Sequence, residues 1–583
     1  MATTAPSGDS LISNLPTAAA LNSTEYLPMD QTINGVNGPT TTTVKISSTT
    51  LASQILSTNN IITPQAYGAK GDGVTDDSAA VLAASTAAAA RGISMILVSK
   101  YFIGSSITLP SNIETTGGQL IWSGTTTVTI NGKCILTDEQ TAFSYPSTAH
   151  IALTADTFTS MGWFAIKNDG SQDCTYVIQD LVNSAGSLSR SITFPAGTYA
   201  CSNSVISYNH QFDGYGFLKM GPDTIPAGKV VNTSFQMSIP TNFTNPGSCL
   251  YYLQNRFLSD GVTVTCKIAD GTYTWPQTYM QHPQGNRIQI IGNQTTPANV
   301  VVQFDATNFN SGFQASYGYA LGLLDGMTIT TTNAWISHGN WNSAIIPYGA
   351  GIIALYDGNI NVGAHVIVTK CYYGIKAAYG GSINCAPGVS VTEAGDVAYH
   401  AFHDGSINAL GCYAQGTYDA AFGIGYGFLG EMGGTIHAEN ATSSYNYLHG
   451  FAAISTGSVW AQKSSSHNNN QAGYFAQEGG HVNASSPSNV TGSPTLSTAN
   501  RWGARAYQGG TVEFFSSTAS NNSSDGLSCN GGVIVADGAT STGNTGAGQV
   551  ARCNGLVYGT ITSTGNGVAD FAQEGGIINA DET

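Results

Sequence analysis

Charged residues are scarce in this sequence, and basic residues are the scarcest. Asp, Glu, Lys and Arg make up only 9% of its 583 residues, and 18 Lys and Arg stand against 34 Asp and Glu, giving a formal net charge of −16. Binding to DNA or RNA depends mainly on basic side chains that neutralise phosphates. We therefore expect no nucleic-acid partner.

Paired cysteines and long apolar runs are missing too. None of the ten cysteines forms a Cys-x-x-Cys pair, which counts against a zinc ribbon or a redox motif. His400-x-x-His403-Asp404 is the one spacing that hints at a metal, and we expect neither metal nor cofactor. The longest apolar-looking run, residues 79–98, is broken by Arg91 and Gly92, so we expect no membrane insertion. The first 30 residues lack a basic residue and a sustained apolar segment, so we expect no signal peptide.

What the sequence does contain is a repeat in its last third. A phrase of the form Gly-Phe/Tyr-x-Ala-x-x-Gly-Gly-x-Ile/Val-x-Ala returns nine times between residues 379 and 580, at steps of 21 to 30 residues. A period of this length is typical of solenoids, in which each unit buries its apolar face only against its neighbours.

Within each repeat, the residues after the glycines alternate between apolar and polar, which is the period of a strand. The glycines fit a turn that needs positive φ. No unit has the apolar stripe of a helix, which counts against a leucine-rich repeat. We therefore predict an all-β fold, a right-handed parallel β-helix, with a β-sandwich as the alternative. The first apolar position is always Ile or Val: Ile383, Ile407, Ile436, Val459, Val482, Val512, Ile534, Val557 and Ile578.

A second motif, Tyr-Gly-Ala-x-Gly-Asp-Gly-x-Thr-Asp-Asp, lies within residues 63–90 and leads into an alanine-rich segment, and a weaker echo of it begins at Asp169. We expect a helix here that stops at Gly92, with Thr75 or Asp76 as its N-cap. The segment resembles the opening of the pectate-lyase-like family of phage tailspikes and tail fibres, in which this motif precedes a helix that caps the first coil. The resemblance implies structural rather than catalytic roles for Asp72, Asp76 and Asp77.

We expect four parts in the chain. Residues 1–60 are polar and rich in Thr and Ser, and would form an extended N-terminal arm. Residues 61–145 would hold the capping segment and a first β region, residues 146–258 an insert or second β module, and residues 259–583 the main β-helix. The resemblance implies a homotrimer assembled in the host cytoplasm, attached through the arm to a phage tail or baseplate protein. In the alternative, the arm wraps its own trimer.

The resemblance also implies a host surface glycan as the ligand, bound by a fibre or cut by a tailspike endoglycosidase. A cellular polysaccharide lyase or adhesin is a further alternative. The Arg-x-Pro-x-x-Arg motif of pectate lyases and the Asn-Thr-Asp, Gly-Asp-Asp and Gly-His-Gly motifs of polygalacturonases are absent. Glycosidases need two carboxyl groups about 5–9.5 Å apart. Acids and histidines gather between residues 393 and 449: Glu393, Asp396, His400, His403, Asp404, Asp419, Glu431, His437, Glu439 and His449.

From this group we take Glu393, Asp404 and Glu439 as candidate catalytic residues. Glu431 lies three residues before a repeat glycine, and we interpret it as stabilising the turn. The alternation also predicts one outward-facing group on three neighbouring coils. A Trp beside a carboxylate and histidines on a flat sheet suits sugar rings, although an ordinary solvated face or a subunit contact is the alternative. The candidate substrate-binding residues are His437, Glu439, Trp460 and His481.

Overall fold

The computed structural model describes residues 26–35, 38–47, 61–156, 158–184, 190–202, 210–305, 310–332, 349–418, 423–486 and 495–579. The chain divides into two compact units, Met1–Lys229 and Val230–Thr583. In the described ranges the fold is almost entirely β, as predicted, with α-helices at α2 (Ser78–Arg91), α3 (Thr175–Ser184) and α4 (Pro246–Leu253). The finer division into four parts stays a prediction.

The first unit begins with an antiparallel hairpin, β1 (Tyr26–Gly35) and β2 (Gly38–Ser47). It falls within the predicted arm, of which residues 1–25 and 48–60 lie outside the described residues. Short sheets follow. Their strands are β3 (Asp72–Asp76), β5 (Lys100–Ile103), β8 (Gln119–Trp122) and β10 (Phe143–Ser144); β4 (Ser94–Leu97) and β7 (Asn112–Thr115); β6 (Ile107–Leu109), β9 (Thr127–Ile130) and β11 (His150–Leu153); β12 (Phe158–Ser160), β14 (Arg190–Phe194) and β16 (His210–Gly214); and β13 (Asp169–Asp173), β15 (Thr198–Ala200), β17 (Phe217–Met220) and β18 (Asp223–Pro226).

The predicted capping helix is α2, but its N-cap differs from the prediction. Asp77 occupies that position, one residue later than expected, because Asp76 still belongs to strand β3. The carboxylate of Asp76 accepts hydrogen bonds from the backbone nitrogens of Ser78 and Gly104, both at 3.0 Å. The helix ends at Gly92 with φ of 65°, as predicted.

The other two aspartates of the motif also bind backbone groups. Asp77 accepts hydrogen bonds from the nitrogens of Lys70 and Gly71, at 2.8 and 3.0 Å. Hydrogen bonds from Thr75 and Val74 lower the pKa of Asp72 to about 2. These contacts agree with the structural role that we propose for the three acids. The echo at Asp169 has the same form, because strand β13 leads into helix α3 as β3 leads into α2.

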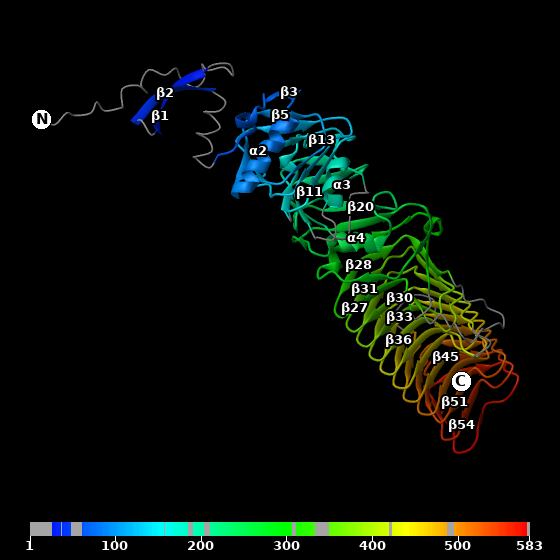
Figure 1. Ribbon diagram of the computed structural model, residues 1–583. Helices are drawn as coiled ribbons and strands as arrows, with labels where there is room; N and C mark the ends of the chain where they lie inside the picture. Colours follow the sequence, from blue (N-terminus) through cyan, green and yellow to red (C-terminus); the bar gives the residue numbers. More distant parts are fainter. Residues whose placement is uncertain are drawn as a thin grey trace. The chain divides into compact units, whose positions relative to one another are not determined.

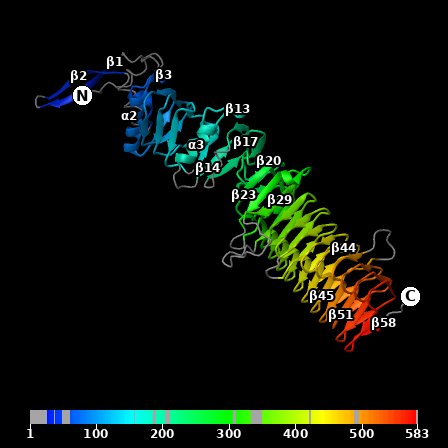
Figure 2. The ribbon, with the colours of Figure 1, turned by 90° about the vertical axis from the view of Figure 1, so that its right-hand side faces the viewer.

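The second unit winds as a parallel β-helix with three long sheets, and from β22 onward the strand number rises by three along each sheet (Figures 1 and 2). The first long sheet contains β20 (Phe235–Ile239), β22 (Val264–Ile268), β25 (Ile288–Ile291), β28 (Ala320–Asp325), β31 (Asn359–Val362), β34 (Ser382–Cys385), β37 (Ser406–Asn408), β40 (Thr435–His437), β43 (Ser458–Trp460), β46 (His481–Asn483), β49 (Thr511–Glu513), β52 (Val533–Val535), β55 (Leu556–Tyr558) and β58 (Ile577–Asn579).

The second and third long sheets complete each coil. The second contains β23 (Gly271–Trp275), β26 (Val300–Phe304), β29 (Met327–Thr331), β32 (Val366–Thr369), β35 (Ser390–Thr392), β38 (Tyr413–Gln415), β41 (Thr442–Ser444), β44 (Ser465–His467), β47 (Leu496–Thr498), β50 (Thr518–Ser520), β53 (Ala539–Thr542) and β56 (Ile561–Thr564). The third contains β24 (Thr278–Met280), β27 (Phe313–Ser316), β30 (Ala350–Leu355), β33 (Tyr373–Ala378), β36 (Val397–Phe402), β39 (Tyr426–Glu431), β42 (Phe451–Ile454), β45 (Ala472–Gln477), β48 (Trp502–Tyr507), β51 (Leu527–Asn530), β54 (Gln549–Arg552) and β57 (Phe571–Ala572).

The predicted column of Ile and Val lies in the first long sheet and is confirmed in register. Ile383 faces Ile407, which faces Ile436, and the pairing continues in the same way to Ile578. From Ile383 to Val557 these side chains have no exposed surface, so they form the core that the alternation predicted.

The two glycines of the repeat turn serve different purposes. Gly380 has φ of 78°, as predicted, but its neighbour Gly381 does not have positive φ. A Cβ atom at Gly381 would lie 2.3 Å from the carbonyl oxygen of Ala354 in the preceding coil. The second glycine is therefore required by the close approach of two backbones.

Six asparagines, one per coil, line the turns between the second and third long sheets, and all but the last, Asn566, are buried. In the first five, the backbone nitrogen donates to the side-chain oxygen of the next, at 2.9 to 3.1 Å. This ladder was not predicted from the sequence. It supplies hydrogen-bond partners to backbone groups that the turns take away from water. Its members are Asn446, Asn469, Asn500, Asn522, Asn544 and Asn566.

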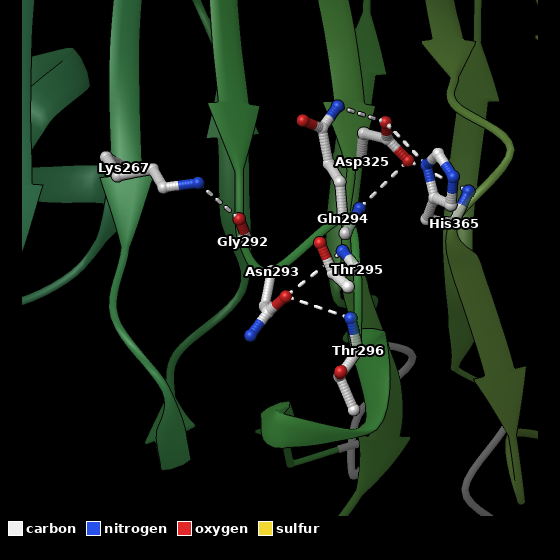
Figure 3. Close-up of polar contacts among 9 residues, drawn as sticks. Lys267, Gly292, Asn293, Gln294, Thr295, Thr296, Asp325 and His365 are labelled. Carbon is white, nitrogen blue, oxygen red and sulfur yellow. Dashed lines mark hydrogen bonds and ion pairs between the residues drawn. The ribbon is translucent and has the colours of Figure 1, made fainter.

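A buried carboxylate fixes the turns of the first coils, as Figure 3 shows. Asp325 accepts hydrogen bonds from Gln294 Nε2 at 2.6 Å and from the backbone nitrogen of His365 at 2.9 Å. Burial raises the pKa of Asp325, but these hydrogen bonds outweigh it and the net pKa is lower than usual. The Asp325 carboxylate thus joins three successive coils by hydrogen bonds.

Candidate functional site

The four residues predicted to bind substrate do lie together, on the outer face of the first long sheet. His437 is directly opposite Trp460 on the next strand, and their rings are nearly parallel, with centroids 6.1 Å apart. His437 Nδ1 lies 3.5 Å from Glu439 Oε1. The ring of His481 meets Trp460 edge-on, with centroids 6.0 Å apart. Their role in binding remains a proposal.

This face resembles a solvated surface in other respects. Its strands alternate between buried and partly exposed residues, and the His437 side chain is 46% exposed. His481 Nε2 lies 3.3 Å from Glu513 Oε1, so one histidine already has an acidic neighbour within the sheet. The carboxylate oxygen Oε2 of Glu439 is buried and has no hydrogen-bond partner among the described residues.

The three candidate catalytic acids lie at three different turns. Glu393 follows strand β35 and approaches Lys370 Nζ at 3.9 Å; Asp404 lies between β36 and β37; Glu439 follows β40. Across the described parts of the chain, no hydrogen bond or ion pair joins any two of them. Their role as catalytic acids stays a prediction. Asp419, also in the predicted acidic region, lies outside the described residues.

The outer face of the third long sheet is different, because it is largely buried. Five of the six residues of β36 are buried, and the same holds for β45. Parallel sheets covered on both faces have near-continuous apolar strands. Here an apolar layer spans six coils: Val397, Leu429, Ala452, Ala472 and Phe475 are buried, with Tyr373, Tyr426, Ile454, Trp502 and Tyr507 packed against them.

Three ionisable side chains are set into one end of this layer. Lys376 on β33 is directly opposite His400 on β36, and His400 Nε2 lies 3.2 Å from Glu431 Oε2 on β39. Lys376 Nζ lies 3.8 Å from the ring centroid of Tyr373 and 5.3 Å from that of Phe402. Three neighbouring coils therefore bring a lysine, a histidine and a glutamate together on one face.

Burial sets the charge states of this group. It lowers the pKa of His400 to about 4, against the opposite effect of Glu431, so the imidazole is neutral at neutral pH. Nε2 then carries the proton and donates to Glu431, while the buried Nδ1 has no partner among the described residues. The hydrogen bond from His400 lowers the pKa of Glu431, which is an anion. Burial also lowers the pKa of Lys376, to about 8.

A cavity of about 260 Å³ opens beside Lys376. This volume lies just below the range of roughly 300–1,000 Å³ that is usual for small-molecule sites. Lys376 is the one charged residue in the lining that the structure describes. The lining comes from β27, β30, β33 and β36 and the segments next to them: Ser311, Gln314, Ile353, Leu355, Tyr373, Lys376, Ala378, Tyr379 and Phe402.

Tyr379 also belongs to a stack of rings that follows the turns of successive coils. Tyr317, Tyr356, Tyr379 and His403 stack in that order, with centroid distances of 5.1 to 5.2 Å and interplanar angles of 10° to 13°. Tyr317 is 75% exposed and forms the open end of this stack. The stack thus extends the aromatic surface beyond the cavity, from Tyr379 to Tyr317 on one side and to His403 on the other.

Sequence reasoning missed Lys376, Tyr373 and Phe402, and it interpreted Glu431 only as a turn residue. One signal was available. The outward positions of the third-sheet strands are apolar or aromatic where a solvated strand would carry polar residues, as in Tyr373 and Leu429. The suggested metal spacing finds no support, since the described residues contain no group of three His, Cys, Asp or Glu that could hold a metal ion.

No helix among the described residues is long and apolar enough to span a membrane.

No protein-family model matches the sequence. Over 129 residues the chain is 34% identical to "Depolymerase 1, capsule K30/K69-specific" of Klebsiella phage K5-2; this segment covers 21% of the chain and 16% of that relative. The chain therefore matches about a sixth of the relative's length. The match confirms the resemblance to phage proteins of this kind.

Solved structures give weaker likenesses. The A-module of mannuronan C-5 epimerase AlgE6 of Azotobacter vinelandii is 12% identical, with coverage of 90% of this chain and 96% of that one and a TM-score of 0.18. ORF18 of Geobacillus virus E2 is 11% identical, with 93% and 68% coverage and a TM-score of 0.13. The Dettilon tailspike protein is 12% identical, with 88% and 69% coverage and a TM-score of 0.15. Scores this low carry no argument about function.

Proposed function

We propose that this chain is a tailspike or tail-fibre subunit of a bacteriophage, and that it binds polysaccharide at the surface of the host cell. The observation that carries the proposal is the cavity on the outer face of the third long sheet, where aromatic rings surround a lysine. The partial sequence match to a phage capsule depolymerase supports the same function.

The lining of the cavity suits a sugar. Pyranose rings have apolar C–H faces and polar edges, and amphipathic aromatic residues contact both. Tyr373 and Phe402 offer ring surface, and Tyr379 adds a hydroxyl group and a link to the exposed ring stack. His437, Glu439, Trp460 and His481 on the first long sheet are proposed as a second contact for the same polymer.

The partners follow from this role and are part of the proposal. The chain would form a homotrimer, and the arm of residues 1–60 would attach it to a phage tail or baseplate protein in the virion. It would assemble in the host cytoplasm and act at the host cell surface. A cellular polysaccharide lyase or adhesin would have no place in a virus particle, so finding the protein in purified particles tests this part.

A depolymerase that cuts the polysaccharide is the second candidate, and the group of Lys376, His400 and Glu431 favours it. Perturbed ionisable groups beside a cavity are typical of catalytic sites. Glu431 is an anion that could act as a base, and Lys376, with a pKa of about 8, could exchange a proton near neutral pH.

One experiment separates the two candidates. The purified full-length protein is incubated with an array of bacterial capsular polysaccharides and lipopolysaccharides, and both retention of protein and polymer length are measured. Retention on at least one polymer of unchanged length supports the binding fibre. Shortened chains support the depolymerase. Neither retention nor shortening on any polymer would contradict the proposed function.

A further inference from the structure

We propose that the cavity beside Lys376 takes a carboxylate-bearing sugar unit, and that Lys376 is the counter-ion that selects it. The inference rests on the proposed function, because it names the class of sugar that the same site binds. Its basis is the geometry of the lysine and the composition of the cavity wall.

Lys376 is a half-buried cation that forms no direct ion pair with any described residue. It lies in a chain with only 18 basic residues and a net charge of −16. No described carboxylate lies within the 4.0 Å ion-pair distance of its Nζ. Asp396 and Glu431 attract the ammonium only from beyond that distance, and Glu431 already accepts a hydrogen bond from His400. An ammonium held in a partly apolar place without a counter-ion is costly, and an anionic ligand would remove that cost.

The position of the ammonium is fixed by aromatic rings. Nζ lies over the face of Tyr373 and near that of Phe402, contacts that hold a cation without neutralising it. The long side chain is therefore oriented before a ligand arrives, which lowers the entropy cost of binding. Both rings also line the cavity, so a sugar ring packed against them would bring its carboxylate to Nζ.

The rest of the wall selects against other anions. The remaining residues are apolar, aromatic or uncharged polar, and none of them adds a second positive charge. A phosphate or sulfate group is usually bound by several cations or by arginine forks. A single lysine between ring faces instead fits one carboxylate carried on a largely apolar body, as in a uronic acid or a pyruvate ketal on a hexose.

The first test needs no variant. Capsular polysaccharides retained by the wild-type protein are treated with carbodiimide and borohydride, which converts uronic carboxylates and pyruvate carboxylates to alcohols. We expect retention to fall about tenfold or more on the reduced polymers. Mild acid, which removes pyruvate ketals only, then separates the two sources: loss of retention indicates the ketal, and unchanged retention indicates the uronic acid.

The second test uses three variants of the full chain on the untreated polymer. Lys376→Met keeps the length of the side chain and should lose about tenfold in affinity, whereas Lys376→Arg should retain most of it. Lys370→Met removes the same charge from an exposed lysine outside the cavity, and should change affinity by less than about twofold. Thermal unfolding of each variant shows whether its fold is intact.

The outcomes are distinct. If the wild-type protein binds its polymer equally well before and after carboxyl reduction, the inference is wrong while the proposed function stands. Equal losses in Lys376→Met and Lys370→Met would also overturn it, because they would show a general effect of charge. If the wild-type protein neither binds nor shortens any polymer, the proposed function itself fails.

Discussion

The first and third long sheets of the β-helix share their coils and their inner cores, but their outer faces differ. On the first sheet, outward positions carry polar and aromatic residues such as His437 and Trp460, and the strands alternate in burial. On the third sheet, strands β36 and β45 are buried almost throughout. Burial therefore shifts the pKa values of ionisable groups on the third face. Groups with shifted pKa values are typical of sites that catalyse a reaction or bind a ligand selectively.

The comparison teaches that polar residues on a solenoid strand are a poor guide to its site. The first face attracted attention in the sequence because its residues are of types that contact sugars. The third face also holds aromatic and ionisable residues, and these are embedded in an apolar layer beside a cavity. A charged group in an apolar setting interacts more strongly with a ligand than the same group in water.

The largest loss of stability is expected from a substitution that disrupts the inner core shared by both sheets. Val482 lies in the inner column, with no exposed surface. Val482→Asp would bury an unpaired charge, which costs several kcal/mol, so the stack should lose its cooperative unfolding transition. Thr511→Asp, at a half-buried outward position paired with His481, is the matched control and should change the thermal midpoint little. Equal damage by both would contradict the assignment of inner and outer positions.

The second prediction applies if the protein shortens its polymer, and it tests whether the acid on the third face contributes to catalysis. Glu431→Gln should slow shortening by about a hundredfold or more, as loss of an acid–base group does. Glu393→Gln, at an exposed turn beside the second long sheet, should slow it by less. A larger loss in Glu393→Gln would favour Glu393, one of the three acids predicted from the sequence, as the catalytic residue. It would contradict a catalytic role for the third face.

The third prediction is a loss of stability in acid. The pKa of His400 is about 4 in the folded chain, because of burial, against about 6.5 in an unfolded one. As the pH falls, His400 therefore takes up a proton in the unfolded chain before it does so in the folded one. The contribution of neutral His400 to the free energy of unfolding is full above about pH 6.5 and is lost progressively down to about pH 4. The change is about 3 kcal/mol.

Thermal midpoints at a series of pH values measure this decline. His400→Gln should make the decline between pH 6.5 and 4 shallower, whereas His437→Gln, on the half-exposed face, should change it less. His449, whose pKa burial lowers to about 3, contributes to the same decline and remains in both variants. A profile that responds equally to both substitutions would show that the two faces do not differ in burial.

The smallest effect is expected from the first face. Trp460→Ala removes ring area between His437 and His481 and should weaken adsorption to host cells by a few fold, about 1 kcal/mol, with folding intact. Lys376→Met should weaken it more. Unchanged adsorption in Trp460→Ala would count against the first face as a glycan contact.

Much of the fold was predictable from the sequence because the repeat is local. The alternation around Ile383 specifies a strand, and its return every two dozen residues specifies stacking. The position of the cap helix followed from a short motif, although the N-cap fell at Asp77 because Asp76 remained in its strand. The asparagine ladder was missed although its members return at nearly the same steps as the repeat, since an asparagine in a turn is common and the sequence does not show that its side chain is buried.

The sequence by itself determined which residues face the core of the β-helix, because that depends only on the period of a strand and the length of a coil. Only the tertiary structure decided where the cavity lies. Its wall draws on Gln314, Ile353, Lys376 and Phe402, which belong to four strands spread over nearly ninety residues. They meet because turns of different lengths bring those strands into register, and burial, which sets the charge of each group, exists only after they have met.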